Sequence, residues 1–287
     1  MVFPSSLLCP ESNDTCLAES EIFMSIYVMS DIHGCYDRLN EMLSLISMSE
    51  KDELILAGDY VDRGIQSLEV LRWIVSKPAN VTFLKGNHDA QFAHYVRRIA
   101  YAAASLTADH EFSYTDALME IYDLAEYHAM RDYEWFDAYG TISDLISDKN
   151  IRFEELLSFG KILDGLPCVA TRSAGGRSYI IVHAGYTESL DKVSAMYRTL
   201  EDFYLEARTD AFTNGGKSGH TIISGHTPTV VENLPTFTGG TVYFHENLKD
   251  GCRYYDIDCG CVFREKGQDD HGRLACIRLG DEKIFYC

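Results

Sequence analysis

Short apolar runs alternate with polar, glycine-containing turns along the first ninety residues of the chain. The apolar runs 25–29, 53–57 and 81–84 each have the length of a buried strand. The segments between them, 36–47 and 68–75, place apolar residues every three or four positions, which is typical of helices that pack one face on a sheet. This order of strand, turn and helix predicts parallel strands joined by right-handed crossovers.

Residues 91–162 interrupt this alternation. They are rich in Ala, Tyr, Leu and acidic side chains, and they predict a helical insertion. Within it, Trp135 and Phe136 fit a place in the hydrophobic core better than a role as a ligand platform. Strand-like runs then return, and the last four of them are closely spaced, which predicts antiparallel pairing. These runs lie at 178–182, 221–224, 241–246, 252–258, 274–279 and 283–286.

We predict an α/β fold of the α+β kind, with a single domain over residues 24–287. No internal repeat or low-complexity linker divides this part of the chain, and the helical insertion covers about 91–162. Residues 1–23 carry several polar and acidic side chains and precede the first clean strand, so we expect them to form a poorly ordered leader.

The composition is that of a globular protein with a large core, since 46% of the 287 residues are hydrophobic and 24% are charged. A formal net charge of -19 opposes a nucleic acid or an anionic membrane as the main partner. The nine cysteines are an odd number without a C-x-x-C pair, which favours reduced thiols in a cytoplasmic protein. No apolar run has the length of a membrane helix.

The turn 58–64 follows an apolar run without a spacer and presents the side chains of Asp59, Asp62 and Arg63. Ligand sites in α/β proteins gather beyond the carboxyl ends of strands, which makes this turn a candidate site. Taken alone, it is equally compatible with an ordinary turn that holds an Asx hydrogen bond and a surface ion pair. The repetition of similar turns along the chain favours the functional interpretation.

Five strand-like runs end in polar turns that contain glycine and at least one potential metal ligand. Each ligand alone could be a capping or turn residue, but together they predict a metal centre. Carboxylate, amide oxygen and imidazole donors suit Mn, Fe or Zn, and six of them can hold two ions that promote an in-line phosphoryl displacement. The candidate ligands are Asp31, His33, Asp59, Asn87, His183 and His226.

The motifs around these ligands resemble those of the calcineurin-like metallophosphoesterases, in that family's order. More narrowly, they are similar to bacterial-type serine/threonine phosphatases of the phosphoprotein phosphatase family. The resemblance covers 24–90 and 178–287 well, and it implies two mixed β-sheets sandwiched between helices, with a helical insertion. The matching motifs are Asp31-Ile32-His33-Gly34, the turn 58–64, Gly86-Asn87-His88-Asp89, His183-Ala184-Gly185 and Gly225-His226-Thr227.

The resemblance implies two divalent metal ions, Mn2+ first and Fe or Zn as alternatives, with Asp59 as the bridge between them. It gives Asp31, His33 and Asp59 to one ion. It gives Asp59, Asn87, His183 and His226 to the other ion. A shared carboxylate keeps the two ions close enough to act on the same phosphoryl group.

The resemblance also implies catalytic roles for residues that flank the ligands. His88 would be the general acid toward the leaving group, and Asp62 would orient it. Arg63 would bind phosphate oxygens, with a surface ion pair as the alternative. Arg208 would be a second phosphate ligand, but its stretch lacks the tryptophan usual in the family, so an exposed helical arginine remains the alternative.

The leading hypothesis is a serine/threonine phosphatase that uses a metal-bridging water as the nucleophile. Its substrate would be a phosphorylated protein or peptide, or a small phosphoester. Residues 34–37 and 67–71 also resemble the symmetrical diadenosine tetraphosphate hydrolases, which is the alternative. The Asp62-Arg63-Gly64 form of the turn is, however, the protein-phosphatase version. A catalytically silent scaffold that binds phosphorylated partners is a third hypothesis.

Overall fold

The computed structural model describes residues 25–76, 78–105, 113–129, 135–147, 151–247 and 249–287. The strands are β1 (Ile26–Met29), β2 (Glu53–Leu56), β3 (Val81–Phe83), β4 (Val169–Ala174), β5 (Arg177–Val182), β6 (Thr221–Ser224), β7 (Tyr243–Asn247), β8 (Cys252–Asp256), β9 (Ala275–Arg278) and β10 (Ile284–Tyr286). The helices are α1 (Tyr36–Leu45), α2 (Ser67–Val75), α3 (Asn87–Ala104), α4 (Tyr114–Ala129), α5 (Trp135–Ser147), α6 (Phe153–Asp164), the 3-10 turn η1 (Leu190–Lys192), α7 (Leu200–Glu206), α8 (Thr209–Thr213) and α9 (Cys261–Glu265).

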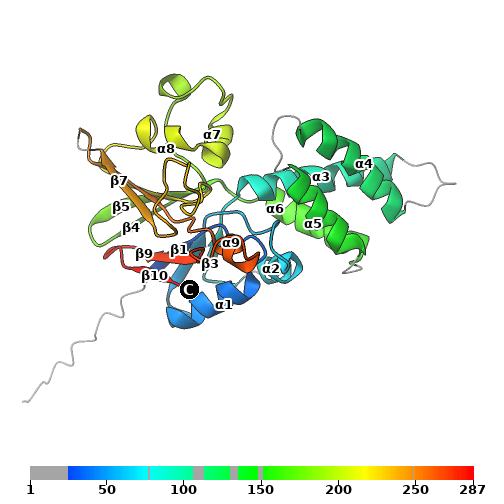
Figure 1. The fold of residues 1–287 in the computed structure, drawn as a ribbon, viewed down its shortest axis with the longest axis horizontal. Helices are drawn as coiled ribbons and strands as arrows, with labels where there is room; N and C mark the ends of the chain where they lie inside the picture. The colour runs from blue at the N-terminus through cyan, green and yellow to red at the C-terminus, as the bar shows by residue number, and fades with distance from the viewer. Residues whose placement is uncertain (1–24, 77, 106–112, 130–134, 148–150, 248) are drawn as a thin grey trace, which may run out of the picture.

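Two mixed five-stranded sheets lie face to face, with helices outside them (Figure 1). Their strand orders are β10-β9-β1-β2-β3 and β4-β5-β6-β8-β7. One apolar cluster fills the space between the sheets, including Val28 and Ile55 from the first sheet and Ile181 and Ile223 from the second. Helices α1 and α2 cover the outer face of the first sheet, and α7 and α8 cover that of the second. The predicted α/β fold with two mixed sheets between helices is confirmed.

The predicted repeat of strand, turn and helix is present as β1 to α3. Strand β1 pairs in parallel with β2, and β2 pairs in parallel with β3. The region predicted to be helical forms helices α3 to α6, which project beside the sheets in Figure 1. The leader expected over 1–23 lies outside the described residues, and the domain boundaries remain a prediction.

The last four strands pair only partly as expected. Strands β7 and β8 are antiparallel, and so are β9 and β10, but the two pairs belong to different sheets. Strand β8 is also parallel to β6, because their connection crosses over and does not turn back directly. Strand β4 was not predicted, since its residues alternate between partly buried and exposed and form no apolar run.

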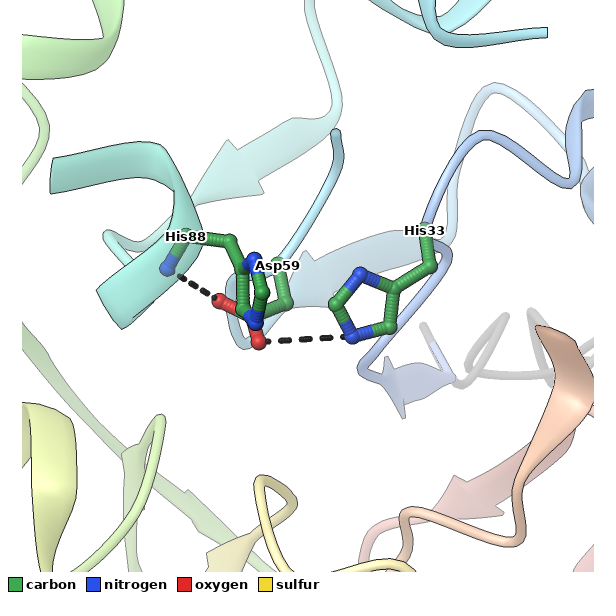
Figure 2. A group of neighbouring side chains, drawn as sticks. All are labelled: His33, Asp59 and His88. Atoms are coloured by element: carbon green, nitrogen blue, oxygen red, sulfur yellow. Dashed lines mark hydrogen bonds and ion pairs between the residues drawn. The ribbon is translucent and has the colours of Figure 1, made fainter. Parts of the chain in front are cut away.

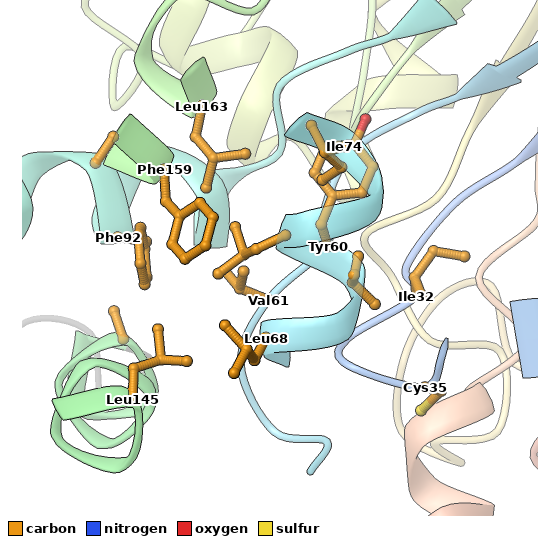
Figure 3. Close-up of a cluster of buried hydrophobic side chains, with 14 of the residues drawn as sticks. Ile32, Cys35, Tyr60, Val61, Leu68, Ile74, Phe92, Leu145, Phe159 and Leu163 are labelled. Atoms are coloured by element: carbon orange, nitrogen blue, oxygen red, sulfur yellow. The ribbon is translucent and has the colours of Figure 1, made fainter. Parts of the chain in front are cut away.

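The turn 58–64 is anchored in the largest apolar cluster. Tyr60 and Val61 point into this cluster, where Phe92, Phe159 and Leu145 also lie (Figure 3). The hydroxyl oxygen of Tyr60 lies 2.9 Å from the carbonyl oxygen of Leu56, at the end of β2, and 2.6 Å from that of Leu84, after β3, and its one proton is shared between them. The apolar residues of the turn thus fix it in the core and leave its charged residues on the other side.

Other expectations concern the insertion, the thiols and the membrane. Phe136 packs against the same cluster as expected, whereas the side chain of Trp135 lies outside the described part. The seven cysteines in the described ranges are free thiols, and Cys9 and Cys16 fall outside those ranges. Among the helices of the described ranges, none combines the length and the apolarity that crossing a bilayer requires.

Candidate metal centre and active site

The six predicted ligands come together beyond the carboxyl ends of parallel strands from both sheets. The loop after β1 supplies Asp31 and His33, the loop after β2 supplies Asp59, and Asn87 begins α3 just after β3. The second sheet supplies His183 after β5 and His226 after β6. All six side chains belong to residues that are at least 93% buried, so the cluster is shielded from bulk water.

Asp59 lies at the middle of the cluster, as the predicted bridge should. Its Oδ2 is 3.5 Å from His33 Nε2, and its Oδ1 is 3.4 Å from His183 Nε2. Two overlapping groups of donor atoms share this carboxylate, and within each group the atoms lie within 4.8 Å of one another. One group is His33, Asp59 and His88 (Figure 2), and the other is Asp59, His183 and His226.

Asp31 reaches the cluster from the side of His226. Both of its carboxylate oxygens lie 3.2 Å from the His226 amide nitrogen, which donates to them. Its negative charge also raises the pKa of Asp59, which requires the two carboxylates to be close. The structure therefore brings Asp31 together with the other predicted ligands, although the compact group around His33 contains His88 in its place.

The hydrogen bonds of two histidines direct lone pairs into the cluster. His183 Nδ1 lies 2.9 Å from the Ala57 carbonyl oxygen, and His33 Nδ1 lies 2.9 Å from that of Val61. A carbonyl oxygen only accepts, so both Nδ1 atoms carry the proton and a neutral ring presents an Nε2 lone pair. The lone pair of His183 faces Asn87 Oδ1 at 2.9 Å. Two acceptors at this distance fit neighbouring ligands of the same cation.

The ionisation of the buried side chains also indicates a metal centre. Burial raises the pKa of Asp31 and Asp59 well above the usual range of aspartate, and neighbouring carboxylates raise it further. Burial lowers the pKa of His183 to about 3 and keeps its ring neutral. Neutral imidazoles and crowded carboxylates are both stabilised by a divalent cation. The residues present therefore fit divalent metal ions.

Backbone strain is concentrated in this site. In the described ranges, eight residues other than glycine have positive φ, and six of them belong to the candidate site. Left-handed backbone is costly for such residues and persists only where the surroundings enforce it, which is common in functional sites. These six residues are Asp31, His33, Asp59, Asp62, Arg63 and His226.

Two glycines let the backbone approach the ligands closely. A methyl group on Gly225 would overlap the Asp31 carboxylate, and one on Gly86 would overlap the carboxylate of Asp59. Glycine at these positions leaves room for the carboxylates, which explains why glycine flanks both Asn87 and His226 in the sequence.

The predicted acid pair is present beside the ligands. His88 Nδ1 lies 2.7 Å from Asp62 Oδ2, and both side chains are completely or almost completely buried. The amide nitrogen of His88 donates to Asp59 Oδ1 at 3.1 Å, which ties the histidine to the bridging carboxylate (Figure 2). The ring therefore has a fixed place next to the candidate metal centre.

Both predicted phosphate-binding arginines lie at the site. Arg63 Nη1 is 3.2 Å from His33 Nε2, and its Nε donates to Asp137 Oδ2 at 3.1 Å. Arg208 lies between α7 and α8 and donates to the His226 carbonyl oxygen at 3.0 Å, which makes it half-buried rather than an exposed helical residue. Two guanidinium groups thus flank the ligand cluster from opposite sheets.

Three residues at the site were given no role by the sequence analysis, although Asp89 belongs to one of the matching motifs. Asp89 accepts hydrogen bonds from three backbone amides, those of Asp59, Tyr60 and Gly86, at 2.8 to 3.0 Å. Its position three residues after a helix cap is a sequence signal for this role. Asp137 and Thr141 of α5 contact Arg63 and Asp62 respectively. Nothing in the helical pattern of the insertion marks these two residues.

Comparisons with known proteins agree with this arrangement. The family model described as calcineurin-like phosphoesterase matches residues 24–259. The symmetrical bis(5'-nucleosyl)-tetraphosphatases of Chromobacterium violaceum and Legionella pneumophila are each 48% identical to the chain over 67 residues. These matches cover 23% of this chain and 24% of each relative, so the chain spans about a quarter of the length of the curated relatives it matches.

A solved structure extends the likeness to nearly the whole fold. A provisionally assigned diadenosine tetraphosphatase superposes with a TM-score of 0.51 at 19% sequence identity. The superposition covers 93% of this chain and 94% of that chain. At this identity, the likeness concerns the fold.

Proposed function

Because the chain belongs to the calcineurin-like phosphoesterase family and is thus a phosphoester hydrolase, we propose that it cleaves a dinucleoside tetraphosphate symmetrically. The observation that carries this choice of substrate is the 48% identity over 67 residues to two symmetrical tetraphosphatases. The substrate predicted first from the sequence was a phosphorylated serine or threonine, and these two relatives favour the alternative prediction over it. The products of symmetrical cleavage would be two nucleoside diphosphates.

The metal ligands in this proposal are Asp31, His33, Asp59, Asn87, His183 and His226, which would hold two divalent ions, Mn2+ first. The overlap of two donor groups at Asp59 supports a pair of ions. Two such ions, when bound, would lower the pKa of the attacking water and offset charge on the phosphoryl oxygens. Fe and Zn accept the same donors.

His88 would hold the proton that the leaving oxygen requires. Its Nδ1 is engaged by Asp62, so Nε2 is the nitrogen that would pass the proton on. Burial lowers the pKa of His88 in the protein alone, and an adjacent phosphoryl anion would raise it. Arg63 and Arg208 would bind the phosphoryl oxygens, which suits their planar, multiply donating side chains.

A second candidate is a phosphatase that acts on phosphoserine and phosphothreonine. The Asp62-Arg63-Gly64 form of the turn supports it, because this form resembles the phosphoprotein phosphatases. The same metal ligands and the same acid pair would serve both reactions, so the two candidates differ only in the group that leaves.

Side-by-side turnover separates the candidates. We would chelate the protein, restore manganese, and measure initial rates with diadenosine tetraphosphate and with a panel of phosphoserine and phosphothreonine peptides. Faster turnover of the dinucleotide supports the proposal, whereas faster turnover of the peptides moves the protein to the second candidate. Peptide binding without turnover of either substrate would overturn both in favour of a silent scaffold. Asp59→Asn is the control, since loss of the bridging carboxylate should abolish manganese-dependent turnover.

A further inference from the structure

Helix α5 belongs to the helical insertion, yet it lies against the turn 58–64 of the candidate active site. Leu145 of α5 is completely buried in the cluster that also contains Val61 and Leu68 (Figure 3). This apolar contact holds the helix beside the turn. The polar face of the same helix carries Asp137 and Thr141, which lie one turn apart.

Thr141 completes the hydrogen bonding of Asp62. Its hydroxyl donates to Asp62 Oδ1 at 2.5 Å, while Asp62 Oδ2 lies 2.7 Å from His88 Nδ1. Each oxygen of this fully buried carboxylate therefore has its own partner. A carboxylate held at both oxygens cannot rotate, and it fixes the plane in which the His88 ring must lie.

Asp137 holds Arg63 in a similar way. Its carboxylate accepts from the Nε of Arg63 at 3.1 Å, while Nη1 of the same guanidinium is 3.2 Å from His33 Nε2. The carboxylate thus contacts the inner edge of the guanidinium and turns its terminal nitrogens toward the ligand cluster. This orientation suits a group that binds phosphate through terminal N–H donors.

The turn needs these contacts, because its backbone is strained at the two residues concerned. Asp62 and Arg63 have φ of 71° and 67°, and two consecutive left-handed residues other than glycine are rare. A cleft of about 440 Å³ opens beside these contacts, lined by Arg63, Ser67, Phe136, Asp137, Thr141 and Lys266 among others.

We propose that helix α5 is part of the catalytic apparatus, with Thr141 as the positioning residue for the Asp62–His88 pair and Asp137 as the positioning residue for Arg63. This inference rests on the proposed roles of His88 and Arg63, but it does not depend on which phosphoester is the substrate. The helical insertion would then contribute to catalysis in addition to covering the hydrophobic core.

The first test removes only the hydroxyl of Thr141. In manganese-loaded Thr141→Val, we expect kcat to fall by roughly 10-fold, as when a supporting hydrogen bond is lost, with KM within about twofold. Thr141→Ser keeps the hydroxyl and should recover most of kcat. The substrate is whichever of the two candidates the wild type turns over faster. Equal kcat values in the valine variant and the wild type would overturn the role of Thr141.

A second readout needs neither metal nor turnover. The proton between His88 Nδ1 and Asp62 should give a downfield imidazole N–H signal in the proton NMR spectrum of the chelated protein. The signal is assigned by its absence in His88→Asn. We expect it to shift or broaden in Thr141→Val and to persist in Thr141→Ser. An unchanged signal in the valine variant contradicts the inference even if the choice of substrate is wrong.

The test of Asp137 expects a change in KM rather than in kcat. Asp137→Asn should raise KM by roughly 5-fold to 10-fold with little change in kcat, because substrate phosphate meets a less ordered guanidinium. Asp123→Asn removes the same charge from an exposed position on neighbouring α4 and should leave both constants unchanged. If Asp137→Asn leaves KM unchanged or lowers it, the positioning role is wrong. Circular dichroism confirms that each variant is folded.

Discussion

His183 Nε2 and Asn87 Oδ1 lie 2.9 Å apart, and neither atom brings a proton to the contact when the histidine donates through Nδ1 to Ala57. Such a contact is unfavourable in the protein alone and becomes favourable when both atoms bind the same cation. The site should therefore be less stable without metal than with it.

Metal removal should lower the stability of the folded protein. We expect chelation to lower Tm and manganese to restore it, by about 2.7 kcal/mol of unfolding free energy at a concentration 100 times Kd. Differential scanning calorimetry measures the change. Asp59→Asn is the matched variant, since it should reduce the manganese-dependent increase in Tm. An increase of the same size in this variant would show that manganese binds elsewhere.

The stabilisation by manganese should grow as the pH rises from about 4 toward neutrality. Burial raises the pKa of Asp31 and Asp59 above that of the unfolded chain, so in the metal-free protein these carboxyls favour folding at low pH and lose that contribution as the pH rises. The same loss of protons frees both carboxylates to bind metal. The difference in Tm between metal-loaded and chelated protein, measured at several pH values, checks this. A difference that stays constant with pH would argue against these ligands.

Gly225→Ala should weaken metal binding with little loss of the fold outside the site. The added methyl group would overlap the carboxylate of Asp31 and push it away from His226. We expect manganese affinity, measured by titration calorimetry, to fall by at least tenfold. Gly165→Ala is the control, because its methyl group would meet its nearest neighbour only at 3.4 Å. Unchanged affinity in Gly225→Ala would mean that Asp31 is not a ligand.

The effect of His88→Asn should depend on the leaving group. An alkoxide from phosphoserine is a strong base and needs a proton in the transition state, whereas a nucleoside diphosphate leaves more easily without one. We expect kcat to fall by roughly 10² to 10⁴ for phosphopeptides and by less for diadenosine tetraphosphate. Single-turnover rates with both substrates measure this. Equal losses would show that His88 acts by some means other than proton donation.

Asp89→Asn should destabilise the loops that carry the ligands. The Asp89 carboxylate accepts from the amides of Asp59, Tyr60 and Gly86, and an amide side chain cannot accept all three with equal strength. Hydrogen bonds to charged groups contribute about 1.5–3 kcal/mol each, so we expect a loss of roughly that size in urea unfolding. Asp123→Asn, at an exposed position on α4, is a control for the loss of charge.

The sequence was sufficient to predict the parts of the fold whose residues repeat a local pattern. Strands β1 to β3 are short, mostly apolar runs with a glycine turn after each, and the ligands at their ends follow from that position. The division of the late strands between two sheets was harder to predict from the sequence. Strand β8 pairs with β7 in one direction and β6 in the other, which depends on packing between distant segments rather than on spacing.

The contribution of α5 could not be predicted for a different reason. Thr141 and Asp137 look like ordinary polar positions of an amphipathic helix, and only the docking of Leu145 into the core brings them to Asp62 and Arg63. A contact between two separate elements cannot be recognised from the residue spacing within either element. Arg208 differs in this respect, because the family resemblance predicted it as a phosphate ligand. Only its contact with the His226 carbonyl oxygen depends on how α7 and α8 cover the second sheet.

The strand order of the first sheet constrains how the protein can be made. Strand β1, which carries two of the ligands, is paired on one side by β9, so that Val28 lies opposite Ile277. During synthesis on the ribosome, that edge of β1 stays open until residues 275–278 of β9 have emerged. An uncovered edge strand invites pairing with other chains. The nascent chain should therefore be most open to wrong pairing at this edge until β9 is in place.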